Sequence, residues 1–99
     1  MKCKLRRNVI LRDWYDCIDK YQAQYGRYPK HVEMSIETLE AMMRYLYKKQ
    51  LYGLEFRQDV EYAESRNTRV VAHRTERIFF EGVEIYIKND LENEEMRIW

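Results

Sequence analysis

Residues 25–42, YGRYPKHVEMSIETLEAM, decide the predicted fold, because a helix end, a strand and a helix start follow one another within them. The preceding residues place apolar side chains at steps of three and four, which is typical of an amphipathic helix. Gly26 suits the left-handed conformation that closes a helix, and Pro29 prevents the helix from continuing. We therefore predict a helix over 9–25 with this inward stripe: Leu11, Trp14, Ile18, Tyr21 and Tyr25.

A short strand and a second helix follow the proline. His31–Met34 alternates between polar and apolar residues, which predicts a strand with Val32 and Met34 facing inward. Ser35 is a suitable N-cap, so the second helix is expected to begin there and to end near Lys49. Its predicted inward stripe is Ile36, Leu39, Met43, Leu46 and Tyr47.

The C-terminal half is predicted to be mostly strand. A tight turn at Gly82 between two alternating apolar segments predicts a β-hairpin. Residues 50–69 are less regular: 51–56 are compatible with a strand broken at Gly53, and 59–65 with either a helical turn or a loop. Four segments have the character of strands: 70–73, 78–80, 83–87 and 96–99.

These elements predict a single α+β domain over residues 1–99. Two amphipathic helices are expected to pack on one face of a small, mainly antiparallel sheet that ends in a β-hairpin. Residues 1–8 are a candidate flexible, basic N-terminal arm. The expected buried set is Trp14, Ile18, Leu39, Met43, Leu46, Val83, Ile85 and Ile87.

The composition favours a cytoplasmic protein. The chain has 99 residues and a net charge of +1, and it contains neither a membrane-spanning apolar run nor a signal-peptide pattern. No membrane partner is expected. Cys3 and Cys17 could pair with each other, but reduced thiols are the simpler expectation for a cytoplasmic chain.

No motif predicts catalysis, a cofactor or a metal. The two cysteines and two histidines lack the paired spacing of a zinc site, and neither a phosphate-loop nor a dinucleotide-binding motif occurs. A Cys17–histidine pair is open as a nucleophile and base, but an inert thiol beside the helical stripe is the stronger interpretation. The chain is therefore expected not to be an enzyme.

The best candidate for binding a partner is the basic segment around His73. In an extended conformation its arginines could bind phosphate or carboxylate groups, and nearby tyrosines could stack on bases or on a protein surface. The alternative is that these charges only protect the edge of a sheet from aggregation. The candidate partner-binding residues are Arg69, His73, Arg74, Arg77 and Tyr86.

Two stretches resemble a module of tailed-phage major capsid proteins, in which a strand after a proline leads into a helix and a later glycine hairpin precedes an acidic loop. The first stretch matches at Pro29, Val32, Met34, Ser35 and Leu39. The second matches at Phe80, Gly82, Val83, Ile85, Leu91 and Ile98. The resemblance covers roughly half of the chain and implies a small phage- or prophage-encoded protein with a similar α+β module, not a shell subunit.

The leading functional hypothesis is a non-enzymatic, phage-type protein that acts through protein–protein interaction. Its expected partner is a bacterial protein, for instance an enzyme or defence complex that it inhibits in the host cytoplasm. One alternative is a homo-oligomer that binds a nucleotide or nucleic acid through an Arg/Tyr-rich surface. A further alternative is a minor structural component of a phage particle.

Overall fold

The computed structural model describes the backbone of residues 1–65 and 68–99, and the side chains of residues 1–58 and 76–99. Two helices and six strands make an α+β fold, as predicted. In chain order the elements are β1 (Lys2–Lys4), the 3-10 helix η1 (Arg7–Val9), α1 (Ile10–Tyr25), β2 (His31–Met34), α2 (Ile36–Lys48), β3 (Leu54–Ser65), β4 (Thr68–Phe80), β5 (Val83–Ile87) and β6 (Glu95–Ile98).

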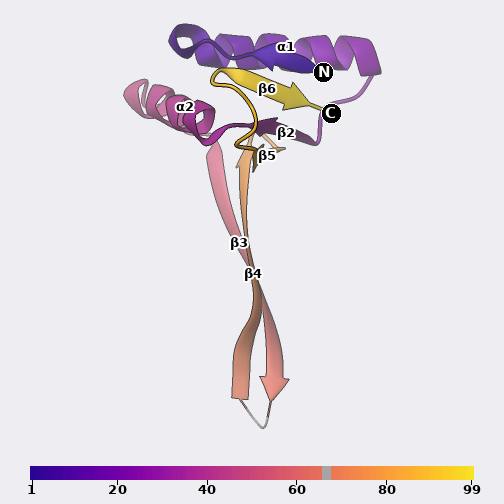
Figure 1. The fold of residues 1–99 in the computed structure, drawn as a ribbon, viewed down its shortest axis with the longest axis vertical. Coiled ribbons are helices and arrows are strands. Elements are labelled where there is room, and N and C mark those ends of the chain that lie inside the picture. The colour runs from indigo at the N-terminus through magenta and orange to yellow at the C-terminus, as the bar shows by residue number, and fades with distance from the viewer. Residues whose placement is uncertain (66–67) are drawn as a thin grey trace.

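The six strands form one sheet in the order β1-β6-β2-β5-β4-β3. The sheet is mainly antiparallel, and β2 and β5 pair in parallel. Their register aligns Val32 with Ile85, and β6 adds Ile98 to the same row. These residues face the helices, so both helices cover one face of the sheet and the opposite face is open (Figure 1).

The core lies between the helices and the covered face of the sheet. Its largest member, Trp14 of α1, is fully buried and meets the Phe80 ring edge-on, with 5.2 Å between the ring centres. Burial of apolar surface on this scale is the main favourable contribution to folding. The core contains Leu5, Ile10, Trp14, Cys17, Ile18, Tyr21, Val32, Met34, Leu39, Met42, Leu46, Phe80, Val83, Ile85, Met96 and Ile98.

The predicted helix ends are confirmed. Gly26 closes α1 with a φ of 68°, and its N–H donates to the carbonyl of Gln22. Ser35 is the N-cap of α2, where its hydroxyl accepts a hydrogen bond from the Thr38 N–H at 3.2 Å. Both contacts satisfy backbone groups that a helix end would otherwise leave unpaired.

The predicted hairpin is also confirmed, with Glu81 and Gly82 as its turn. Both have positive φ angles, 50° and 81°, which match the twist of a two-residue hairpin. Two tyrosines hold this turn: the Tyr15 hydroxyl donates to the Glu81 carboxylate at 2.5 Å, and the Tyr28 hydroxyl donates to its carbonyl at 3.3 Å. The first contact joins the turn to α1.

Two residues of the predicted core are exposed. Met43 lies on the outside of α2, because Thr38, Leu39 and Met42 form the inward row of that helix. The predicted inward stripe of α2 is therefore rotated relative to the row that the structure buries. Ile87 is the last residue of β5, where the strand leaves the sheet and its side chain reaches solvent.

β3 and β4 pair along their length as an antiparallel ladder, which extends as an arm beyond the helices (Figure 1). The helical turn considered for 59–65 is wrong, because these residues pair with β4 along an antiparallel ladder. A register shift occurs between Glu61 and Tyr62. The predicted strand at 70–73 is confirmed as part of β4, and Gly53 precedes β3 instead of interrupting it.

The N-terminal residues contribute to the sheet. β1 pairs with β6, so Lys2–Lys4 of the segment considered as a basic arm lie in the first strand. The expectation of reduced thiols is wrong, since Cys3 of β1 and Cys17 of α1 form a disulfide with their Cα atoms 6.2 Å apart. Pairing with β6 brings Cys3 over the buried side of α1, which sequence spacing alone does not indicate.

Candidate binding surfaces

Charged side chains dominate the open face of the sheet. Among the residues whose side chains the structure describes, strand alternation directs every second residue of the sheet away from the helices. Opposite charges therefore come to lie on neighbouring strands of this face. The charged members are Lys2, Lys4, Glu33, Glu55, Arg57, Arg77, Glu84, Glu95 and Arg97.

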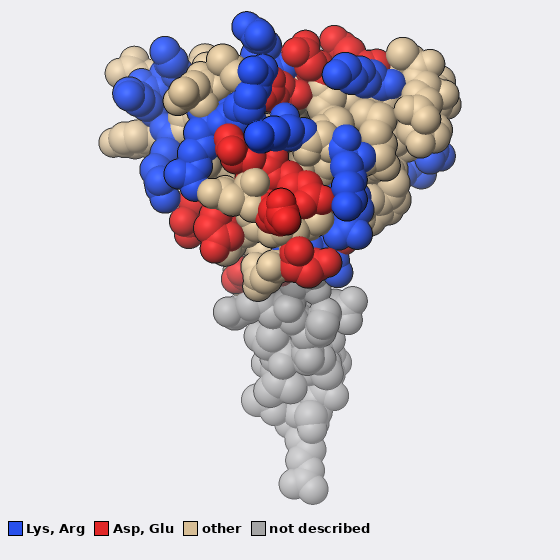
Figure 2. Space-filling model, turned by 45° about the horizontal axis from the view of Figure 1, so that its top comes forward, with Lys and Arg blue, Asp and Glu red and all other residues tan. Residues whose placement is uncertain are grey.

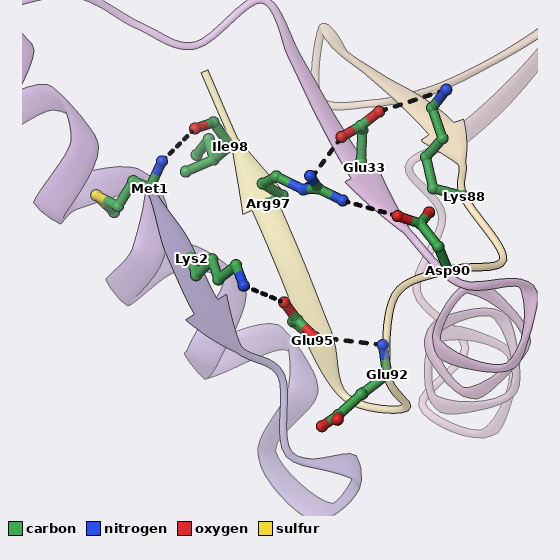
Figure 3. Close-up of polar contacts among 9 residues, drawn as sticks. All are labelled: Met1, Lys2, Glu33, Lys88, Asp90, Glu92, Glu95, Arg97 and Ile98. Atoms are coloured by element: carbon green, nitrogen blue, oxygen red, sulfur yellow. Dashed lines mark hydrogen bonds and ion pairs between the residues drawn. The ribbon is translucent and has the colours of Figure 1, made fainter.

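Ion pairs within the sheet hold many of these charges. Arg97 Nε lies 3.3 Å from Glu33 Oε1, without the alignment of a hydrogen bond, and its Nη2 lies 3.5 Å from Asp90 Oδ2 (Figure 3). Lys88 Nζ approaches the other Glu33 oxygen at 3.8 Å, so two cations flank a carboxylate that is 7% exposed. Figure 2 shows acidic and basic side chains intermixed on the globular part of the molecule.

The structure brings together two of the five predicted partner-binding residues. Arg77 binds both Glu84 oxygens, each at 3.0 Å, and the Tyr86 hydroxyl donates to the same carboxylate at 3.2 Å. The hydrogen bonds from Arg77 lower the pKa of Glu84, whereas desolvation raises the pKa of Tyr86. The side chains of the other three lie outside the described residues: Arg69, His73 and Arg74.

Arg77 also covers an aromatic ring on the open face. Its guanidinium lies 5.0 Å from the centre of Phe79, and the guanidinium of Arg57 lies 4.2 Å from the same centre. Phe79 is buried beneath them. Arg77 therefore neutralises Glu84 and shields Phe79, which are both contributions to the fold. Its role toward a partner stays a prediction.

A second surface was not predicted from the sequence. Met43 and Tyr47 at the end of α2 and Leu51 and Tyr52 before β3 line a groove of about 630 Å³, which we call the α2–β3 groove. Tyr47 is 88% exposed and Tyr52 is 96% exposed. Met43 and Tyr47 were assigned to the core, and 51–52 fell in the irregular segment, so no periodicity indicated this surface.

The rim of the α2–β3 groove is basic. Lys48 lines the groove and Lys49 follows it, and within the described part of the chain neither ammonium has an acidic partner. One turn earlier, Arg44 is paired with Glu40 at 3.5 Å. The groove thus combines exposed apolar side chains with the positive charge of Lys48, which can attract an acidic ligand.

Comparisons with protein-family models, curated proteins and solved structures found no match for this chain. They leave the resemblance to a phage capsid module untested. Among the described residues, no helix is long and apolar enough to cross a membrane. Within the same residues, no group of three His, Cys, Asp or Glu side chains is placed to hold a metal ion.

Proposed function

We propose that this protein is a non-enzymatic binding module that contacts another protein through the α2–β3 groove. The observation that carries the proposal is the near-complete exposure of Tyr47 and Tyr52 beside Met43 and Leu51. Grouped apolar side chains at a surface commonly mark an interaction site. Tyrosine is also enriched among the residues that dominate binding energy, because its rigid ring gives a large contact area.

The charge at the rim defines the chemistry of the partner. Lys48 favours a protein segment that places apolar side chains in the groove and an acidic side chain at its edge. We include in this proposal the inhibitory role that the sequence suggests, in which the small domain would cover part of the surface of its target.

The experiment compares two exposed tyrosines. Tyr52→Ser removes a ring from the α2–β3 groove, and Tyr25→Ser removes a half-exposed ring from the far end of α1 as a matched control. Each tagged variant is incubated with bacterial lysate, and the captured proteins are quantified by mass spectrometry. We expect Tyr52→Ser to lose at least one protein that the wild type and Tyr25→Ser retain.

The chemistry of the partner is tested with Lys48→Glu. This variant should weaken capture of the same protein, and the difference from wild type should shrink as salt is raised, because screening removes the contribution of the charge. Identical capture by wild type and Tyr52→Ser would refute the proposed site, provided that both variants show wild-type circular dichroism.

A further inference from the structure

β3 is the outer strand of the sheet, so one of its edges is unpaired over the described residues Leu54–Gln58. An exposed strand edge is a template for another strand, and natural proteins commonly protect it with charges, bulges or covering elements. Here the edge carries Phe56, which is 60% exposed on the same side of the sheet as the helices. A large apolar side chain at this position does not protect an edge.

The two neighbours of Phe56 have opposite charges. Glu55 and Arg57 lie on the open face and bind each other, with Arg57 Nε 2.7 Å and Nη2 3.1 Å from the two Glu55 oxygens. The Arg57 guanidinium also lies over the Phe79 ring, which fixes its position on the sheet. Along the edge, an acidic residue, an aromatic residue and a basic residue therefore follow one another: Glu55, Phe56 and Arg57.

We propose that a second copy of this chain pairs with this edge, antiparallel, about a two-fold axis at Phe56. In this register Glu55 of each copy lies opposite Arg57 of the other, and the two Phe56 rings meet at the axis. Leu54 of each copy lies opposite Gln58 of the other. The charge order is therefore self-complementary, which a two-fold symmetric contact requires.

Cross-strand pairs of this kind are favourable in an antiparallel sheet, whereas like charges directly opposite each other are unfavourable. Strand pairing would also satisfy backbone groups along the edge and cover Phe56. Because β3 begins at Leu54 in both copies, the paired residues are 54–58, and of these Leu54 also lines the α2–β3 groove. The inference does not rest on the proposed function, and the residues that test it, Glu55 and Arg57, do not line the groove.

The test uses charge reversal and sedimentation velocity. Glu55→Arg alone places Arg opposite Arg, and Arg57→Glu alone places Glu opposite Glu, so each variant should dissociate into monomers at concentrations where the wild type is dimeric. An equal mixture of the two variants restores both opposite-charge pairs. We expect this mixture to form a one-to-one heterodimer, detected by a mass-distinguishable tag on one variant.

Two controls separate the register from net charge and from folding. Glu40→Arg and Arg44→Glu make the same charge changes in the ion pair on α2, and both should dimerise like the wild type. The doubly reversed chain, Glu55→Arg with Arg57→Glu, should regain the homodimer because it restores the opposite charges. Melting curves of all variants report whether the fold is retained.

Several results would overturn the inference. A wild type that sediments as a monomer at every concentration would do so, including the case in which β3 instead binds a strand from another protein. Dimers of both single variants, or a mixture that stays monomeric while both variants are folded, would reject the proposed register. These results come from substitutions at Glu55 and Arg57, whereas capture of a partner is tested at Tyr52, so failure of one proposal can be distinguished from failure of the other.

Discussion

Met42 and Met43 provide a direct test of how α2 packs, because they are neighbouring residues of one type with opposite burial. Met42 is 0% exposed, whereas Met43 is 39% exposed. Met42→Ala removes buried apolar atoms and leaves a cavity between α2 and the sheet, and substitutions of this kind cost about 2–5 kcal/mol. Met43→Ala removes a side chain that is already partly in water, so the loss should stay below about 1 kcal/mol.

Urea unfolding followed by the fluorescence of Trp14 and Trp99 measures both losses of free energy, and thermal unfolding measures the change in Tm. For a chain of this size, each kcal/mol lowers Tm by roughly 4–8 °C, so Met42→Ala should lower Tm by roughly 8 °C or more. Met43→Ala serves as the matched control at the adjacent position. Equal losses, or a larger loss for Met43→Ala, would show that α2 is rotated about its axis, since neighbouring residues lie about 100° apart on a helix.

Three further predictions concern single contacts. The hydrogen bonds from Arg6 lower the pKa of Asp13 from 3.8 to about 2. The ionised carboxylate therefore stabilises the fold fully above about pH 4, and this contribution is lost as pH falls toward 2. Acid titrations monitored by circular dichroism should show that the stabilities of wild type and Asp13→Asn become equal at low pH. Gly26→Ala should cost about 1–2 kcal/mol in urea unfolding, because φ is 68° and the added Cβ meets no neighbouring atom that could compensate. The Cys3–Cys17 disulfide joins residues with a sequence separation of 14, so its loss in Cys3→Ser should lower the free energy of unfolding by about 3 kcal/mol. A thiol assay of the unfolded wild type should find no free thiol.

The parts of the fold predicted correctly are those with a strong local signal. The helix closed by Gly26, the N-cap at Ser35 and the hairpin at Gly82 each depend on backbone preferences of one or two residues. Helix boundaries and strand alternation were therefore readable without tertiary contacts. The full length of β3 and β4 could not be predicted in this way. These strands are extended chiefly because they pair with each other, and their sequence shows no continuous alternation.

The outward face of α2 shows a second reason for failure. Apolar residues at Ile36, Met43 and Tyr47 continue the helical spacing, so periodicity alone assigned them to the core. The structure buries Met42 instead and leaves these three exposed. An apolar stripe wider than the contact with the sheet cannot be divided into core and surface from sequence alone, because the division depends on the angle at which the helix packs.

The two surfaces differ in what a partner could gain from them. On the open face Glu33 and Glu84 already contact cations of the same chain, so a ligand would have to replace existing ion pairs and desolvate the charges again. In the α2–β3 groove, Tyr47 and Tyr52 are in water, and covering them removes apolar area from solvent without breaking a contact. Covering the groove therefore disrupts fewer existing contacts than covering the described part of the open face, although the open face carries more charge. Among the described residues, this difference favours the α2–β3 groove as the proposed site for a protein partner, and a role for the strand of Arg69, His73, Arg74 and Arg77 stays a prediction.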